Sequence, residues 1–426
     1  MLHLETNKMF DADKWNEIYS SLAKNKLRTA LTAFGVFWGI FMLIIMLGAG
    51  NGLQNGVTEN FSGVATNSVF IWTQRTTIPY SGLPKGRSFY MKNEDIEVLK
   101  NDVKELDVLS PRNQLRGYRG GNNVSYLNQS GNFQVMGDYP QIMKISPMEI
   151  TEGRFLNHLD LEEKRKVVVI GTYVKDVLFK NENPINKNVK VNGVFFKVIG
   201  VFKSKKGGNQ GERDSQTLFI PFTTFQKAFN YGNVVGWIAA TAKPNYSASQ
   251  VEQRIVSILK RRHTVAPKDE RAFGSWNAEE EYNQINGLFS GISMLIWVVG
   301  IGTLSAGIIG VSNIMLIIVK ERTKEIGVRR AIGATPLSIV GQIMTEAIVL
   351  TSIAGYLGLT FGVLVTEAIS NAMGPMQGDS MFTNPTIDLK VALTALSILV
   401  IAGALAGLIP ARKAVKIKPI EALRTE

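Results

Sequence analysis

Four stretches of the sequence are apolar over lengths that would cross a lipid bilayer. They comprise residues 30–50, 288–319, 337–372 and 389–409. An α-helix rises about 1.5 Å per residue, so about 20 residues cross a hydrocarbon core of ~30 Å. Because that core offers no water to backbone N–H and C=O groups, each stretch should be helical. The pattern predicts an α-helical membrane protein with four transmembrane helices.

The charges beside these stretches predict which side of the membrane each connection occupies. The segment 320–336 holds five Lys or Arg side chains, and the final segment, residues 410–426, is also basic. Basic residues precede the first apolar stretch as well. Because cytoplasmic loops carry an excess of Lys and Arg, we expect these segments and both termini in the cytoplasm. Residues 51–287 and the short loop 373–388 are then expected on the opposite side.

Residues 1–29 are expected to contain an amphipathic helix ahead of the first span. Four bulky side chains have the i, i+3, i+4, i+7 spacing of one helix face: Trp15, Ile18, Tyr19 and Leu22. With Lys side chains on its other faces, such a helix would lie in the membrane interface. A helix packed on a soluble core is the alternative. The apolar stretch that follows begins too late and is too long for a cleavable signal peptide.

Residues 51–287 mix short polar and apolar segments and predict a separate extracytoplasmic α+β domain. Strands are expected at 67–73, 166–171, 218–221 and 235–241, and helices at 92–100, 173–179 and 247–262. Residues 188–202 are a predicted hairpin, because two β-rich runs flank Asn192-Gly193, a strong type I′ turn signal. Two stretches rich in Gly and polar residues, 74–88 and 204–216, are expected to be loops.

Small residues recur within the apolar stretches at a spacing that permits close helix contact. Gly302, Ala306 and Gly310 recur every four residues, and Gly35 and Gly39 form a GxxxG pair. Such stripes let helix backbones approach each other, so we expect helix packing at both.

Two carboxylates, Glu346 and Glu367, fall within the third apolar stretch. A charged group in a membrane span is costly and marks a functional position. Because both residues lie toward the ends of the stretch, we expect a headgroup-level role or an interhelical hydrogen bond. Proton or ion coupling is the alternative.

Composition argues against several chemistries. The chain has no Cys, and its three His residues are far apart and match no zinc-binding spacing. We therefore predict no metal site, no cofactor and no catalytic residues. The net charge is +12, but the basic residues cluster beside the apolar stretches, which favours contact with membrane lipids over nucleic acid. The 426 residues contain no GxxxxGK[ST] loop and no Gly-Lys pair, so the chain is not expected to hydrolyse ATP.

Three blocks of the sequence resemble one known family. EIGVRRAIGATPLSIVGQIMTEAIVL, at residues 325–350, looks like the FtsX/MacB-type permease domain of ABC transporters (type VII exporters). Residues 167–225 resemble the MacB-like periplasmic core domain, and EIYSSLAKNKLRTALTAFGVFWGI resembles the start of such permeases. The resemblance implies a porter-like subdomain with an inserted, mostly-β subdomain on the periplasmic side of the cell inner membrane.

The resemblance also implies a function. A MacB-like permease subunit would couple ATP hydrolysis by a separate ATPase subunit to movement of its periplasmic domain, for efflux or export (mechanotransmission). The implied partners are a second copy or a related permease, a periplasmic membrane-fusion adaptor and an outer-membrane exit duct. Two alternatives stay open: an FtsX-like transducer that activates cell-wall hydrolases, and a lipoprotein-releasing permease.

The basic segment 320–336 is the expected coupling element. It is predicted to form a short helix in which Glu325 can pair with Arg329, and Gly333 can end that helix before Thr335 caps the next span. The residues alone support a docking helix and a plain topology signal equally, and the resemblance favours docking onto the ATPase. The residues expected to make this contact are Glu321, Glu325, Ile326, Gly327, Arg329, Arg330 and Gly333, with Val328 and Ile332 as further apolar contacts.

Overall fold

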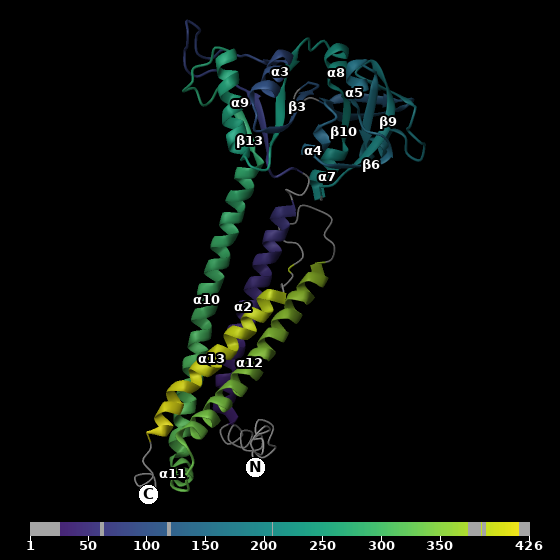
Figure 1. Ribbon diagram of the computed structural model, residues 1–426. Helices are drawn as coiled ribbons and strands as arrows, with labels where there is room; N and C mark the ends of the chain where they lie inside the picture. Colours follow the sequence, from purple (N-terminus) through teal and green to yellow (C-terminus); the bar gives the residue numbers. More distant parts are fainter. Residues whose placement is uncertain are drawn as a thin grey trace, which may run out of the picture. The chain divides into compact units, whose positions relative to one another are not determined.

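The structure, a computed structural model, describes residues 26–59, 64–116, 121–206, 208–373, 385 and 389–416. The chain divides into two compact units (Figure 1). The helical unit comprises Met1–Asn55, Phe289–Pro375 and Phe382–Glu426, and the α/β unit comprises Gly56–Leu288 and Met376–Met381. Most of the expected N-terminal helix, most of the loop 373–388 and the end of the tail lie outside the described residues.

Long apolar helices build the described part of the helical unit. Its helices are α2 (Lys26–Glu59), α10 (Ala278–Glu321), α11 (Thr323–Ala331), α12 (Pro336–Met373) and α13 (Leu389–Val415). Among the described residues, four helices are long and apolar enough to cross a membrane. The expectation of four long apolar helices is therefore confirmed. Helix α10 is continuous from Ala278, so its polar first turns extend the apolar stretch that follows.

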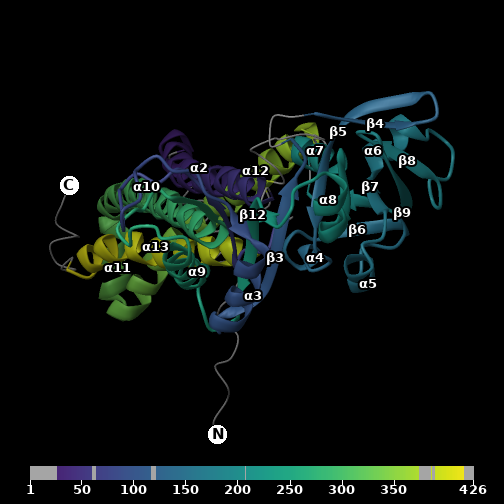
Figure 2. The same cartoon turned by 90° about the horizontal axis from the view of Figure 1, so that it is seen from above.

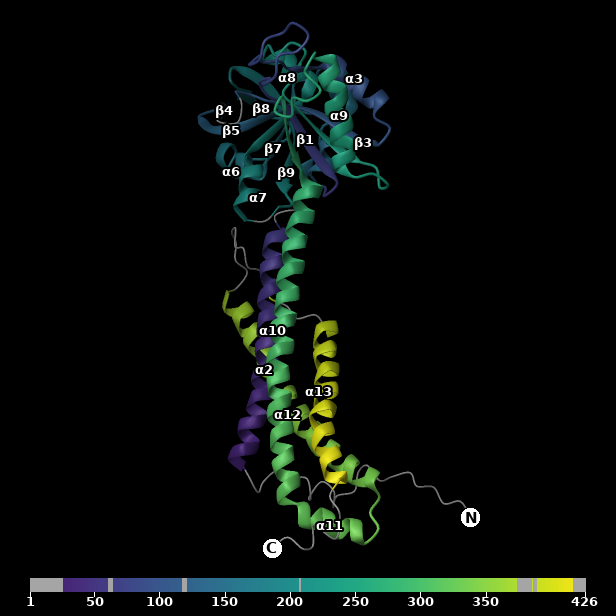
Figure 3. The ribbon, with the colours of Figure 1, turned by 90° about the vertical axis from the view of Figure 1, so that its left-hand side faces the viewer.

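Glycines on α2 and α12 set how closely the long helices approach. A Cβ added at Gly39 would lie 3.5 Å from the backbone N of Leu304, and Gly35 lies on the same face of α2. A Cβ added at Gly358 would lie 2.6 Å from the Phe37 carbonyl oxygen, which leaves no room for a side chain. Helix α2 therefore packs on α10 through one face (Figure 3) and on α12 through another.

The predicted small-residue stripe on α10 does not make this contact. A Cβ added at Gly302 or Gly310 would have no described atom within 4 Å, and Ala306 is exposed. The close approach uses Gly307 instead, where an added Cβ would lie 3.4 Å from the Val36 backbone. Neighbouring residues differ by about 100° around a helix, so the predicted stripe occupies another face of α10. No described helix of this chain covers that face.

The first half of the α/β unit is an antiparallel sheet with helices packed on it. Its strands pair in the order β3-β12-β1-β13. A core of Val, Ile, Leu and Phe side chains lies between this sheet and its helices. The elements are β1 (Ser68–Thr73), α3 (Asn93–Asp102), β3 (Leu106–Gln114), β12 (Trp237–Ala242), α9 (Ala248–Arg262) and β13 (Phe273–Asn277). The short strands β2 (Met91–Lys92) and β11 (Val234–Val235) pair with each other.

The inserted half lies between β3 and β12 in the sequence and is mostly β (Figure 2). Six strands pair in a ring, β10-β7-β9-β8-β4-β5, which closes because β5 also pairs with β10. Closure removes unpaired strand edges, and a second apolar core fills this half. The strands are β4 (Asn122–Tyr126), β5 (Gln129–Asp138), β6 (Met148–Gly153), β7 (Val167–Gly171), β8 (Asn188–Val191), β9 (Val194–Ser204) and β10 (Thr217–Pro221). The helices are α4 (Ile142–Ile145), α5 (His158–Glu162), α6 (Thr172–Leu178), α7 (Gly208–Ser215) and α8 (Phe222–Ala228).

In this half, the residue pattern predicts the turn between β8 and β9 correctly but does not predict α7. Asn192 and Gly193, between β8 and β9, have φ values of 43° and 96°, the positive values that a type I′ turn needs. The expectation of a loop over 204–216 is wrong, because α7 lies within it. The α7 sequence GNQGERDS has two Gly and no bulky apolar residue, so its own propensity is low. The helix forms where it packs against β9.

Candidate functional site at helix α11

Local chemistry ends α11 and starts the next helix. Gly333, just after α11, has a φ of 106°, a conformation that favours glycine, and its N–H donates to the Arg330 carbonyl at 3.1 Å. Thr335 Oγ1 accepts a hydrogen bond from the Ser338 N–H at 3.4 Å, and α12 begins at Pro336. The predicted helix end at Gly333 and the predicted cap at Thr335 are confirmed.

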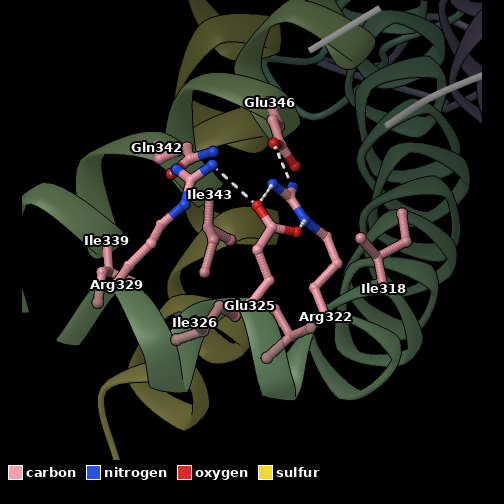
Figure 4. Close-up of a pocket in the computed structure, with 10 residues that line it drawn as sticks. Ile318, Arg322, Glu325, Ile326, Arg329, Ile339, Gln342, Ile343 and Glu346 are labelled. Atoms are coloured by element: carbon pink, nitrogen blue, oxygen red, sulfur yellow. Dashed lines mark hydrogen bonds and ion pairs between the residues drawn. The ribbon is translucent and has the colours of Figure 1, made fainter. Parts of the chain in front are cut away.

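A network of charged side chains joins α11 to α12 (Figure 4). Arg322 donates from Nη2 to Glu325 Oε1 and from Nη1 to Glu346 Oε1, both at 2.9 Å. Arg329 Nη2 lies 2.8 Å from Glu325 Oε1, which is the predicted i, i+4 pair. Arg329 Nη1 also donates to Gln342 Oε1 at 3.1 Å. The Arg322 and Arg329 guanidinium groups therefore bridge the single Glu325 carboxylate on α11 and polar groups on α12.

The Arg322–Glu346 pair of this network is largely removed from water, whereas the Glu325 and Arg329 side chains are 41% and 40% exposed. The Glu346 side chain is only 1% exposed and that of Arg322 is 19% exposed. Hydrogen bonding to Glu325 and the nearby charge of Glu346 raise the pKa of Arg322, so it stays cationic. A cavity of about 20 Å³, room for about one water molecule, lies beside the pair and is lined by the side chains of the network and by apolar side chains. The apolar lining residues are Ile318, Val319, Ile326, Ile339 and Ile343.

Helix α11 is also bonded to α13. Arg330 Nη1 donates to the Val415 carbonyl oxygen at 2.7 Å, at the C-terminal end of α13. That end carries unpaired carbonyls and a partial negative charge, which favours a cation there. Because α11 follows α10 directly in the chain, it is connected to three long helices at once. A force applied to α11 would therefore reach all three.

The outer face of α11 carries apolar side chains that the chain leaves exposed. Val328 is 39% exposed and Ile332 is 82% exposed. Leu337, in the first turn of α12, is 82% exposed as well. Ile326 differs from the expectation of an outward contact, because it is only 8% exposed and packs into the core of the helical unit. An outside contact would therefore fall on Val328 and Ile332.

The remaining predicted residues differ in how far they are exposed. Gly327 is buried with Ile326, whereas Glu321 is exposed beside the network. Of the two roles expected for Glu346, at headgroup level or in an interhelical hydrogen bond, the structure shows the hydrogen bond, which Arg322 donates; Glu367 on the same helix is exposed. Sequence reasoning did not assign Arg322 or Gln342 to the site. The available signal was the carboxylate of Glu346 in an apolar stretch, which requires a cationic partner.

No metal chemistry is evident in this region or elsewhere in the part of the chain that the structure describes. Within those residues, no group of three or more His, Asp or Glu side chains could hold a metal ion.

Family models match both parts of the chain. Residues 29–258 match the MacB-like periplasmic core domain, and residues 297–419 match the FtsX-like permease C-terminal domain. The macrolide export ATP-binding/permease protein MacB of Bdellovibrio bacteriovorus is 30% identical over 409 residues, which are 96% of this chain and 61% of that protein. The chain thus spans about three fifths of the length of this relative.

Other similar proteins are permeases or extracytoplasmic domains. The uncharacterized ABC transporter permease YvrN of Bacillus subtilis is 28% identical over 423 residues, which are 96% of this chain and 98% of that protein. The periplasmic region of MacB from Actinobacillus actinomycetemcomitans aligns with 54% of this chain and 97% of that structure, with a TM-score of 0.43 and 21% identity. On the family matches, this chain belongs to the ABC transporter permeases that combine a MacB-like periplasmic core domain with an FtsX-like permease domain.

Proposed function

We propose that this chain is the permease subunit of a MacB-like efflux or export system and that α11 is where a separate ATPase subunit docks. The observation that carries the proposal is the network that joins α11 to α12 and α13 while its outer apolar side chains stay exposed. A docked ATPase that changes shape would move α11, and the buried bonds would pass that motion to the long helices. The periplasmic core domain would then move with them.

A separate ATPase is supported by the sequence and by one relative. The 426 residues lack a phosphate-binding loop, and YvrN, which matches this chain along 98% of its own length, is a permease. The basic excess at residues 320–336 supports a cytoplasmic position for α11, on the side where ATP is available. On this proposal both termini are cytoplasmic, the membrane is the inner membrane, and a periplasmic adaptor and an exit duct complete the system.

The proposal predicts how ATP hydrolysis divides between subunits. In lipid nanodiscs, this chain alone should release no phosphate from ATP, because it offers no loop to hold the phosphates. When the partner ATPase is added, ATP should be hydrolysed at a rate above that of the ATPase alone. Hydrolysis by the purified chain itself, or no change of the ATPase rate when the chain is added, would contradict the proposal.

A second copy of the chain is the proposed partner of the exposed face of α10. Exposed small and apolar residues recur on this face at alternating intervals of four and three positions. Helices that pack against each other along one line of contact, here called the seam, have this spacing. They are Leu295, Val299, Gly302, Ala306 and Ile309. The two small residues at the centre would let two α10 backbones approach closely.

The chain has no Cys, so single cysteines can test this pairing. Ala306→Cys should form a disulfide-linked dimer in oxidised membranes, because the two α10 helices would meet there. Leu364→Cys is the control, since Leu364 is 55% exposed on α12, away from the proposed seam. Gel mobility without reductant reports the result, and equal cross-linking at both positions or none at Ala306→Cys would refute the seam.

A further inference from the structure

Three hydroxyl groups of the α/β unit are buried without a hydrogen bond. Ser68 and Ser110 are fully buried and Thr241 is 3% exposed, and their side-chain oxygens have no partner among the described residues. They lie on the adjacent strands β1, β3 and β12. Thr241 pairs with Ser68 on one side and with Val108 on the other, so Ser110, two residues after Val108, lies diagonal to it. The three groups therefore form one cluster, the hydroxyl cluster.

The hydroxyl cluster faces the inserted half of the unit. Side chains alternate between the two faces of a strand, so each member shares a face with the residue two positions away. Those residues are Phe70, Val108 and Ala239, which pack into a core that also contains Ile142 and Ile145 of α4. Helix α4 lies against β3 and β12 on this face (Figure 2). The contact between α4 and the three strands is called the α4 interface here.

The α4 interface combines unbonded polar groups with side chains that repack easily. A hydroxyl that loses water on burial and gains no hydrogen bond raises the free energy of the folded arrangement. Met136, Met143 and Met148 belong to the same core or pack against it, and the flexible thioether of Met adapts to altered surroundings. Water that entered this interface would therefore find three hydroxyls ready to bond and a lining that can adjust.

Polar side chains fix the two halves to each other at one end of the α4 interface. Arg112, two residues after Ser110 on β3, donates from Nε to Asp138 Oδ1 at 2.6 Å and from Nη2 to Asp138 Oδ2 at 3.0 Å. Asn93 on α3 and Gln226 on α8 exchange two hydrogen bonds, at 3.1 and 3.0 Å. A separation of the halves would therefore turn about these contacts and open the interface at its other end.

The chain that arrives from α2 reaches the α4 interface at that other end. Helix α2 ends at Glu59, and Ala65 N donates to the Ile145 carbonyl oxygen, at the end of α4, at 2.8 Å. Ser68 N donates to the Ala65 carbonyl oxygen at 3.0 Å, where β1 begins. Ala65 thus bonds both to α4 and to a member of the hydroxyl cluster. A movement of α2 would act on the interface through this residue.

We propose that α4 is a latch, which separates from β1, β3 and β12 when α2 moves, and that water then enters and bonds to the hydroxyl cluster. In this structure the latch is closed, and the three hydroxyls are unbonded. In the open arrangement, their hydrogen bonds to water offset part of the lost apolar contact, so the two arrangements are close in free energy. The two halves of the α/β unit then change orientation instead of moving as one body. The latch rests on the proposed function, because the docked ATPase is what moves α2.

Single cysteines can measure the opening, because the chain has no Cys of its own. Thr241→Cys places a thiol in the α4 interface, and Ala240→Cys places one on the opposite face of the same strand as a matched, buried control. In lipid nanodiscs, a water-soluble maleimide should label Thr241→Cys about tenfold faster than Ala240→Cys, because the interface opens without unfolding of the core under α3 and α9. Equal labelling rates would refute the latch.

Removal of the other two hydroxyls should keep the latch closed. Ser68→Ala with Ser110→Ala deletes groups that gain hydrogen bonds only in the open arrangement. Labelling of Thr241→Cys in this background should slow by about fivefold. Labelling at the original rate or faster would mean that the hydroxyls do not favour opening, and it would overturn the proposal. Equal thermal unfolding midpoints show that the variants compared are folded.

The partner ATPase tests the connection to α2. With the ATPase and ATP present, labelling of Thr241→Cys should accelerate by about threefold, and that of Ala240→Cys should not. Ala65→Pro removes the N–H that bonds to Ile145 and should abolish this acceleration, whereas Ala65→Gly keeps the N–H and should retain it. Normal stimulation of the ATPase without any acceleration of labelling would refute the latch alone. Absence of ATPase stimulation by the unaltered chain would instead refute the proposed function.

Discussion

Glu346→Ala should lower the free energy of unfolding of the helical unit by about 3–5 kcal/mol and disconnect α11 from α12. The carboxylate is 1% exposed and lies 2.9 Å from Arg322, so its removal leaves a cation buried without its main partner on α12. The ATPase should still dock on the outer face of α11, because that face is unchanged. Its stimulation by the chain should fall at least tenfold, since α11 would no longer move α12.

The same helix supplies the control for this variant. Glu367 is also a carboxylate on α12 but is exposed, so Glu367→Ala should change neither stability nor stimulation. Replacing both members of the pair, Arg322→Met with Glu346→Leu, should recover most of the lost stability, because no charge is then buried alone. Thermal unfolding in detergent and phosphate release in nanodiscs measure the two effects. Identical behaviour of Glu346→Ala and Glu367→Ala would show that the pair has no coupling role.

Val328→Asp with Ile332→Asp should abolish ATPase docking while leaving the helical unit folded. Burying two aliphatic side chains contributes roughly 1.5–3 kcal/mol each. Loss of this apolar contact, together with the two added carboxylates, should raise the Kd for the ATPase at least a hundredfold. Both residues are exposed, so the fold of this unit does not depend on them.

A matched substitution separates docking from general surface effects. Leu159, 51% exposed on α5 of the α/β unit, gives Leu159→Asp as a control that should bind the ATPase normally. Binding is measured by biolayer interferometry on nanodiscs, with the unfolding midpoint recorded for each variant. Docking of the Val328→Asp/Ile332→Asp variant at the normal affinity would mean that the ATPase contacts another surface.

Sequence patterns predict this fold best where the governing physics is local. The length of the apolar stretches alone identifies the four long helices. Inside a bilayer, backbone N–H and C=O groups can form hydrogen bonds only with each other, so each stretch must be helical. The turn at Asn192-Gly193 and the end of α11 at Gly333 follow from residues that adopt positive φ at low cost. The strand β3 was not predicted, since it contains Pro111 and several polar residues; it is held by pairing with β12, which lies far along the chain.

The sequence by itself determined the long helices, the α+β character of residues 51–287 and the short basic helix between two spans. Only the tertiary structure decided which faces meet. On α10, a shift of one residue directs Gly307 toward α2 and leaves Ala306 exposed. On α11, Ile326 turns inward and Val328 outward. Arg322 and Glu346 stand 24 residues apart and meet only because two helices pack together. A helix offers several plausible faces to its neighbours, and the choice among them is made by packing over the whole unit.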